Sequence, residues 1–298
     1  MFDPVLILAS PRSFTSVTCA MLGEHPQMYG LPEVNLFVAP TIRELQGFLA
    51  RPRWSEHGLL RAVAELFGGA QTVETIVLAR TWIARRANRS CVSVFRELAE
   101  RVQPRRLVDK SPRTVTKSEH LYRASNAFPK TRFIHLVRHP RSQGESLWNL
   151  GGPLAAQRQD AFDYSTDPPT PDFQKAWFAM QTTIVTFLAG VPRHRWIRLR
   201  GEDLLAHPDE HLRKICQWLE LRTDDQAIAA MKHPERSPFA RPGPRNALLG
   251  NDPGFLRDPA LRQFTAKNLT LHGPLPWRTD GVGFSDEVCS LAWEWGYR

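Results

Sequence analysis

The feature that most constrains the fold is a short apolar run, followed by a turn rich in hydroxyl groups and then by a helix-like segment. The run VLILA covers residues 5–9, the turn SPRSFTS covers 10–16, and the helical segment extends to about Gly23. The first N–H groups of a helix lack backbone partners and carry partial positive charge, so this arrangement is typical of an anion pocket. The phosphate-binding signature GxxxxGK[ST] is absent, because the turn contains neither glycine nor lysine.

Polar clusters also follow two other short apolar segments. The segments are RRLVDKSP (105–112), which leads into DKSPRT, and RFIHLVRHP (132–140), which leads into RHPRS. A fourth candidate strand lies within RWIRLRGEDLL (195–205). Because helix-like segments separate these strands, the sequence predicts an α/β fold with a central parallel sheet flanked by helices. The carboxyl ends of parallel strands share one edge of the sheet, so the three polar clusters should converge there.

The rest of the chain predicts helices and two loops. Residues 41–100 carry helical apolar spacing, AWFAMQTTIVTFLAGVP predicts a helix ending at Gly190, and the C-terminal residues predict an amphipathic helix. The Pro-rich stretch 151–172 predicts a loop or lid, and 240–255 predicts a second loop. No change in composition marks a boundary, so we expect one domain over residues 1–298.

Composition limits the classes of partner. The net charge of +9 is compatible with nucleic acid, a membrane surface or an anionic ligand, but the basic residues form only short groups. We therefore expect no nucleic-acid partner. No stretch of 18 apolar residues occurs, and the first strand begins at Val5, so we expect a cytoplasmic protein without a membrane partner. The four cysteines form no CxxC pair, which predicts reduced, partly buried thiols.

The side chains of the first turn suit a tetrahedral anion. Ser13, Thr15 and Ser16 supply hydroxyl donors, and Arg12 supplies a guanidinium that can bind two oxygens. The same residues would also suit an ordinary capped helix, because serine and threonine are good N-caps. A phosphate or sulfate ligand is thus one of two interpretations of the turn alone.

A second motif connects the turn to a known family. Arg138 follows the third strand, and Ser146 lies eight residues further on. Together with SPRSFTS, this spacing resembles sulfotransferases that use 3′-phosphoadenosine 5′-phosphosulfate (PAPS). The resemblance implies a P-loop-like domain in which Arg12, Ser13, Phe14, Thr15 and Ser16 bind the 5′-phosphosulfate. It also implies that Arg138 and Ser146 bind the 3′-phosphate, and that adenosine 3′,5′-bisphosphate (PAP) is the product.

Other segments extend the resemblance over most of the chain. VDKSP is similar to the family's second strand end, which makes Lys110 and Arg12 candidates for stabilising the leaving oxygen. HPQMYGLPEVNLF resembles polyketide-synthase sulfotransferase domains and tyrosylprotein sulfotransferases, which makes Glu33 the candidate catalytic base. The resemblance implies no metal. It also implies that residues of the late loop touch the nucleotide, and the candidates there are Arg241, Gly243, Arg245 and Asn246.

Three residues depart from the family pattern. Phe14 replaces a glycine in the turn, and Gly201 replaces an aromatic residue near the adenine. Gln181 stands where bacterial relatives often carry a histidine, so that helix supplies no base. His135 is expected to be a packed core residue, and His139 is a weaker catalytic candidate than Glu33.

The resemblance implies transfer of a sulfuryl group to a hydroxyl of a small natural product, either free or tethered to an acyl carrier protein. Acceptor-site insertions are expected at roughly 34–95 and 150–175, with helices and loops forming a lid. Two alternatives stay open: a nucleotide-binding regulatory protein without turnover, and a P-loop kinase. The absence of GxxxxGK[ST] argues against the kinase.

Overall fold

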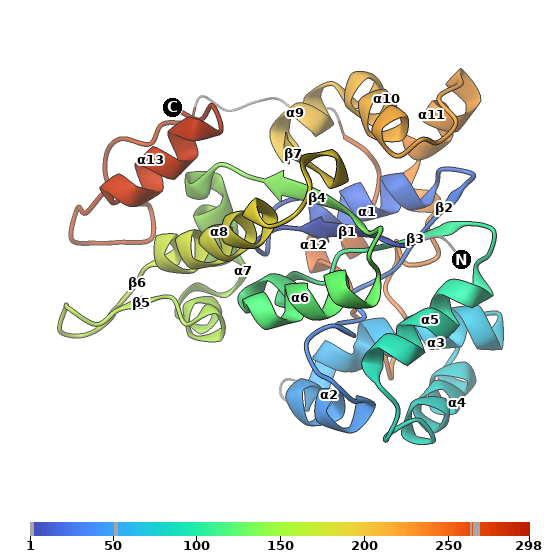
Figure 1. The fold of residues 1–298 in the computed structure, drawn as a ribbon. Coiled ribbons are helices and arrows are strands. Elements are labelled where there is room, and N and C mark those ends of the chain that lie inside the picture. Colours follow the sequence, from blue (N-terminus) through green and yellow to red (C-terminus); the bar gives the residue numbers. More distant parts are fainter. Residues whose placement is uncertain (1–2, 51–52, 263, 265–268) are drawn as a thin grey trace.

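The centre of the molecule, seen in a computed structural model, is a parallel sheet in the order β2-β3-β1-β4-β7 (Figure 1). The structure describes all residues except 1–2, 51–52, 263 and 265–268. The strands of this sheet are β1 Val5–Leu8, β2 Met28–Gly30, β3 Arg106–Asp109, β4 Arg132–Val137 and β7 Trp196–Arg200. Every neighbouring pair is parallel, so the predicted α/β sheet is confirmed.

Helices cover both faces of the sheet. They are α1 Thr15–Gly23, α2 Ile42–Leu49, α3 His57–Gly68, α4 Val73–Ala84, α5 Cys91–Arg101, α6 Ser118–Ala127, α7 Pro140–Gln159, α8 Phe173–Ala189, α9 Gly201–Ala206, α10 Pro208–Trp218, α11 Asp225–Met231, α12 Pro253–Arg257 and α13 Asp286–Glu294. Short 3₁₀ helices lie at Arg53–Glu56, Pro112–Thr116, Arg193–Arg195 and Pro234–Arg236. The helices predicted within 41–100 and at the C-terminus are confirmed.

The side chains of β1 explain why its sequence is continuously apolar. Val5 and Ile7 join a core cluster with residues of α1, α10 and α11, whereas Leu6 and Leu8 join a cluster with residues of α3, α5 and α6. Alternate residues of a strand point to opposite faces, so a strand buried on both faces needs apolar residues throughout. Figure 1 shows α10 and α11 on one side of the sheet and α3, α5 and α6 on the other.

Strand β2 was not indicated by the sequence. Its three residues pair with β3 at the edge of the sheet, and so short a segment carries no readable periodicity. The strand matters for the site because the chain leaves it at the carboxyl edge of the sheet. The segment that contains Glu33 therefore starts close to the end of β3.

The prediction of a loop over 151–172 is wrong for its first part. Helix α7 continues to Gln159, with a break at Gly152, whose φ of 49° lies in the left-handed region. Pro153 then begins the second half of the helix, a position where its fixed φ and missing N–H are tolerated. Ala155 and Ala156 are buried and hold this half against the protein. Beyond it, β5 (Phe162–Asp163) and β6 (Thr170–Pro171) form a small antiparallel hairpin.

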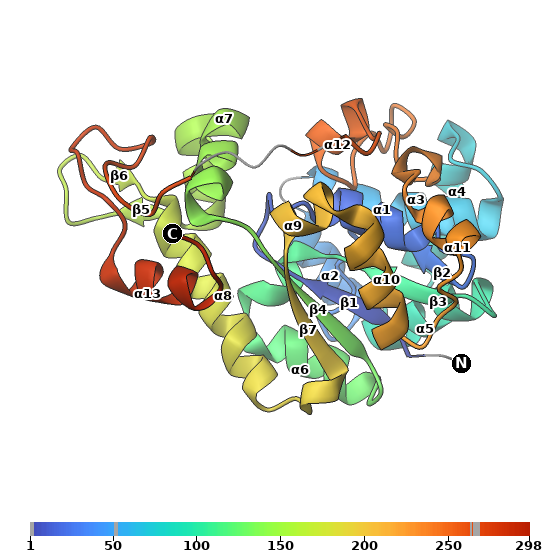
Figure 2. The same cartoon turned by 90° about the horizontal axis from the view of Figure 1, so that it is seen from above.

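The predicted loop over 240–255 is present, and α12 begins at its end. Asp252 caps α12 by accepting hydrogen bonds from the N–H groups of Gly254 and Phe255. The loop is fastened to α3 by the buried Arg61, which donates to the carbonyl oxygens of Arg241 and Leu249 at 2.7 and 3.0 Å. The end of this loop and α12 are thus held beside α1 (Figure 2).

All four cysteines are free and buried, as predicted. Among the described residues, no single helix has the length and apolarity needed to cross a membrane. In the part of the chain that the structure describes, one pair of helices, α3 and α4, reaches that length and apolarity when the two are counted together, and the pair is bent by 102°.

Candidate active site

The turn between β1 and α1 has a backbone suited to an anion. Arg12 and Phe14 both adopt left-handed conformations, with φ of 67° and 61°. Phe14 is the N-cap residue of α1, and its side chain makes no capping hydrogen bond. Turns that contain left-handed residues gather successive N–H groups into a concave anion site, and the helix N-terminus adds partial positive charge. The turn therefore has the form of an anion pocket, with a phenylalanine in a conformation that favours glycine.

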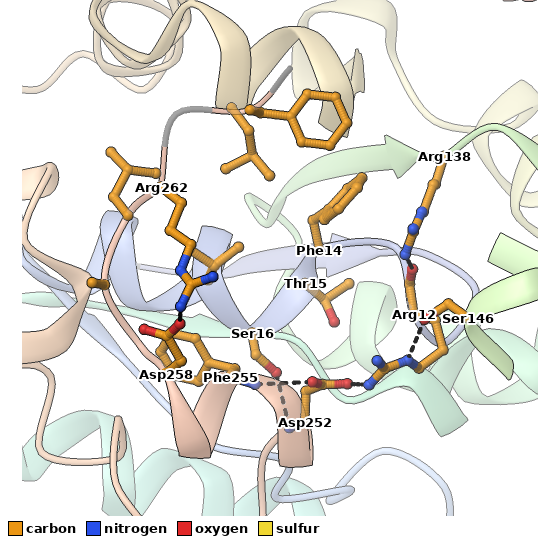
Figure 3. Close-up of a pocket in the computed structure, with 15 residues that line it drawn as sticks. Arg12, Phe14, Thr15, Ser16, Arg138, Ser146, Asp252, Phe255, Asp258 and Arg262 are labelled. Carbon is orange, nitrogen blue, oxygen red and sulfur yellow. Dashed lines mark hydrogen bonds and ion pairs between the residues drawn. The ribbon is translucent and has the colours of Figure 1, made fainter. Parts of the chain in front are cut away.

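A cavity of about 480 Å³ opens at this turn (Figure 3). The predicted donor-site residues that line it are Arg12, Phe14, Thr15, Ser16, Arg138 and Ser146. They come from the turn after β1, from the residue after β4 and from α7. The convergence expected at the carboxyl edge of a parallel sheet is thus present, and the cavity has the size of a small-molecule pocket.

Arg12 is held by partners on two sides of the cavity. Its Nε donates to Ser146 Oγ at 3.0 Å, and its Nη1 forms an ion pair with Asp252. Burial lowers the pKa of Arg12, and the nearby Arg257 acts in the same direction. With its N–H groups on Ser146 and Asp252, the guanidinium is held between α7 and the start of α12 at the cavity (Figure 3).

Arg138 lies against the turn itself. Its Nη1 donates to the backbone oxygen of Arg12, its Nε donates to Ser142 Oγ at 3.0 Å, and its guanidinium carbon lies 4.3 Å from the centre of the Phe14 ring. Burial lowers the pKa of Arg138 to about 10, which leaves it cationic at neutral pH. Arg12 and Arg138 therefore place two positive charges at one cavity. A ligand with two separate anionic groups could bind both of them.

Lys110 connects the turn with Glu33. Its Nζ donates to Ser16 Oγ at 2.9 Å and to Glu33 Oε1 at 2.7 Å. The Lys110 side chain is completely buried, whereas 33% of the Glu33 side chain remains exposed. Lys110 follows the last residue of β3, so the carboxyl end of this strand delivers a cation to the same place as the turn after β1.

A network of hydrogen bonds positions the segment around Glu33. The Glu33 N–H donates to the Gly250 oxygen at 2.8 Å, and the Asn35 N–H donates to Ser111 Oγ at 2.9 Å. Ser111 Oγ in turn donates to Asp109 Oδ1 at 2.9 Å, and burial raises the pKa of Asp109 to about 6. The carboxylate of Glu33 is thus fixed by its backbone on one side and by Lys110 on the other.

Several predicted residues do not line the cavity. Ser13 is buried and its hydroxyl bonds with that of Ser10 at 3.0 Å, inside the turn. Gly243 packs against Arg61 and Ala247, and Asn246 Nδ2 donates to the carbonyl oxygen of Val73 on α4. The late-loop residues outside the cavity lining are Arg241, Gly243, Arg245 and Asn246. Their contact with a nucleotide stays a prediction.

The two histidines have structural partners. His135 is completely buried, as expected, and its Nε2 lies 2.8 Å from Gln181 Oε1. Burial lowers its pKa to about 3. His139 Nδ1 accepts the Arg141 N–H at the start of α7, and burial lowers its pKa to about 4. Both histidines are buried and held by structural hydrogen bonds, whereas 33% of the Glu33 side chain is exposed, so Glu33 remains the better candidate base.

Part of the cavity wall was missed by the sequence reading. These residues are Val17, Leu205, Asp252, Phe255, Asp258, Ala260, Leu261, Arg262 and Phe264. The dipeptide Asp252-Pro253 was a usable signal, because an aspartate followed by proline is a typical start of a helix. Nothing local indicated that this helix would meet the turn after β1, some 240 residues earlier in the chain.

Comparison with known proteins identifies the family of this chain. The model of the sulfotransferase family matches residues 4–225, which include every strand of the parallel sheet. The chain belongs to the sulfotransferase family. No curated protein sequence matches it, so the family model and the solved structures carry the comparison.

Two solved structures share the fold of this sulfotransferase over its whole length. A sulfotransferase domain from the curacin biosynthetic pathway superposes with a TM-score of 0.80 at 24% identity, covering 100% of this chain and 99% of that one. A sulfotransferase domain from the olefin synthase of Synechococcus PCC 7002 superposes with a TM-score of 0.76 at 22% identity, covering 100% and 97%. The P-loop-like sulfotransferase fold expected from the sequence is therefore confirmed.

Proposed function

We propose that this sulfotransferase transfers a sulfuryl group from PAPS to a hydroxyl of a small natural product. The observation that carries the proposal is that residues after β1 and β4 line one cavity, and that Lys110, directly after β3, contacts the cavity residue Ser16. Arg12 and Arg138 supply two separate cationic positions, and Lys110 joins the turn to Glu33. A nucleotide with anionic groups on both its 5′ and 3′ sides fits two such positions, and the helix N-terminus favours the group that lies on the turn.

The proposed reaction uses side chains of this chain alone. The acceptor oxygen attacks sulfur, the bond between sulfur and the bridging phosphate oxygen breaks, and the acceptor proton passes to the Glu33 carboxylate. Lys110 and Arg12 stabilise the negative charge that develops on the leaving phosphate oxygen. Lys110 suits this role because its ammonium already contacts Ser16 on the donor side and Glu33 on the acceptor side.

The acceptor should approach Glu33 from the segments expected to vary between sulfotransferases, 34–95 and 150–175. The first contains α2, α3, α4 and the start of α5, and Gly58 of α3 packs directly against the backbone of Glu33. The second contains the outer half of α7 and the β5–β6 hairpin. The relatives that share the fold come from a biosynthetic pathway and an olefin synthase, so we include acceptors tethered to a carrier protein.

The test of this function is transfer of labelled sulfate from PAPS. Candidate acceptors are phenols, alcohols, sugars, tyrosyl peptides and hydroxyacyl groups on carrier protein. Sulfation of any hydroxyl supports the proposal. Tight binding of the bisphosphate without transfer to any acceptor would favour the regulatory alternative, and magnesium-dependent transfer of phosphate from ATP would favour the kinase.

We predict that Arg138→Ala weakens binding of adenosine 3′,5′-bisphosphate by ~10–100-fold, because one charge-assisted interaction with the 3′-phosphate is lost. Binding of AMP, which lacks that phosphate, should change much less, and this comparison controls for disturbance of the turn that Arg138 contacts. Isothermal titration calorimetry measures both. Equal affinity of the unmodified protein for AMP and the bisphosphate would refute the assignment of the 3′-phosphate to Arg138.

We also predict that Asp252→Asn tightens binding of the bisphosphate by roughly 3–10-fold. Asparagine keeps the oxygen that caps α12, but it removes the negative charge that is paired with Arg12 and would repel the donor. Asp224→Asn is the matched control, because Asp224 caps α11 in the same way and does not line the cavity. Unchanged or weaker binding in Asp252→Asn would show that this carboxylate does not compete with the donor.

A further inference from the structure

The cavity has two chemically different walls. One carries the cations and hydroxyl groups that suit phosphate. The other is apolar and includes Val17 of α1, Leu205 of α9, and Leu261 and Phe264 of the segment after α12. Phe14 also lines the cavity and packs with this apolar cluster. A nucleotide has phosphates at one end and an apolar base at the other. The polar wall therefore suits the phosphates, and the apolar wall suits the base.

Phe14 has an unusual backbone for its residue type. Its φ of 61° is disfavoured for a bulky side chain, and glycine would adopt this conformation freely. Its side chain does not cap α1. The ring instead has the guanidinium of Arg138 at 4.3 Å from its centre and the Phe264 ring edge-on at 5.7 Å. The aromatic ring is thus kept at the cavity despite the backbone strain, which points to a use for the ring.

Gly201 lies directly against the ring of Phe14. A Cβ atom built on Gly201 would lie only 2.5 Å from Phe14 Cδ2, far inside van der Waals contact. Gly201 is not among the glycines with positive φ, so its backbone would accept another residue. What excludes a side chain at position 201 is therefore the Phe14 ring. The two departures from the family pattern therefore belong together. An aromatic ring at position 14, on the turn, takes the place of an aromatic ring at position 201, after β7.

We propose that Phe14 is the aromatic platform on which the base of the nucleotide donor stacks, and that Gly201 is required to make room for it. This inference rests on the proposed function only in assuming a nucleotide ligand. Stacking on an aromatic side chain does not depend on which base is present, and the neighbouring Arg138 adds a cation–π contact on the same ring. Phe14 is thus a binding residue that contacts the base, whereas Arg12 contacts phosphate.

The first test is Phe14→Gly, a substitution that suits the backbone at this position. Removal of one base–aromatic stack should weaken binding of adenosine 3′,5′-bisphosphate by roughly 5–100-fold. Binding of inorganic pyrophosphate, which has no base, should hardly change, and thermal unfolding verifies that the variant is folded. The fluorescence of an etheno analogue of the bisphosphate should be quenched by the unmodified protein and by Phe14→Tyr, but much less by Phe14→Gly. Phe162→Leu in β5 is the control outside the cavity.

The second test moves the ring from position 14 to the adjacent position 201. Gly201→Phe alone should weaken nucleotide binding because its side chain collides with Phe14, and the double variant Phe14→Gly with Gly201→Phe should recover at least part of the base-dependent affinity. The inference is overturned if Phe14→Gly binds and quenches the analogue as well as the unmodified protein does. If the unmodified protein binds AMP and the bisphosphate equally while Phe14→Gly weakens both, the donor assignment fails and the platform stands. If neither nucleotide binds, both fail.

Discussion

Replacing Glu33 by glutamine should lower kcat for an alcohol acceptor by roughly 10²–10⁴-fold, the usual contribution of a general base. Glutamine retains an oxygen that can accept the Lys110 hydrogen bond, now 2.7 Å long, so Lys110 should keep its position. Affinity for the bisphosphate should change little, because Glu33 does not line the donor cavity. Initial rates at saturating donor, together with calorimetric binding of the bisphosphate, measure the two effects.

The effect should depend on the acceptor. A phenol with a pKa near 7 is partly ionised without help, so nitrophenol-type acceptors should lose less rate than aliphatic alcohols. Glu97→Gln is a matched control, because Glu97 also pairs with cations but lies outside the cavity. If Glu33→Gln lowers kcat on an alcohol less than about threefold, Glu33 is not the base. His139 is then the next residue to test, although its ring is buried and its Nδ1 accepts the Arg141 N–H.

Lys110→Met should lower kcat by roughly 10²–10³-fold, which is typical for loss of one preorganised group that stabilises transition-state charge. Methionine fills similar space but leaves Ser16 Oγ and Glu33 Oε1 without their ammonium donor. The protein should still fold, because a buried charge is removed and the partner carboxylate of Glu33 is partly exposed to water. Steady-state kinetics measure the loss of rate, and thermal unfolding verifies that the variant is folded.

Two further variants show whether the charge of Lys110 or the shape of its side chain is needed. Lys175→Met removes a lysine paired with Asp163 away from the cavity and should leave kcat unchanged. Lys110→Arg keeps the charge, but a guanidinium is larger and the Lys110 side chain is completely enclosed, so only partial activity is expected. A folded Lys110→Met variant with nearly normal kcat would exclude this lysine from the reaction.

Local sequence signals were sufficient to predict the parallel sheet and the cationic residues of the site. The apolar run VLILA, the hydroxyl-rich turn and the helix after it form β1, the turn and α1 as expected. Parallel strands end at the same edge, so the position of a residue just after its strand was enough to bring Arg12, Lys110 and Arg138 together. The Pro-rich stretch misled because Gly152 and Pro153 interrupt α7 without ending it.

The functional partners of those residues were decided only by the tertiary structure. Glu33 meets Lys110 across 77 residues of chain, because a three-residue edge strand that has no readable pattern directs the segment there. Asp252 meets Arg12 because the buried Arg61 fastens the loop before it to α3. Phe14 and Gly201 each depart from the family pattern in sequence, but only the structure shows that the two residues are in contact, with the Phe14 ring in the space that a Gly201 side chain would occupy. Periodicity and capping act over a few residues, whereas contacts between distant segments follow from how the whole core packs, so the sequence alone determined the pocket's cationic frame and packing decided what completes it.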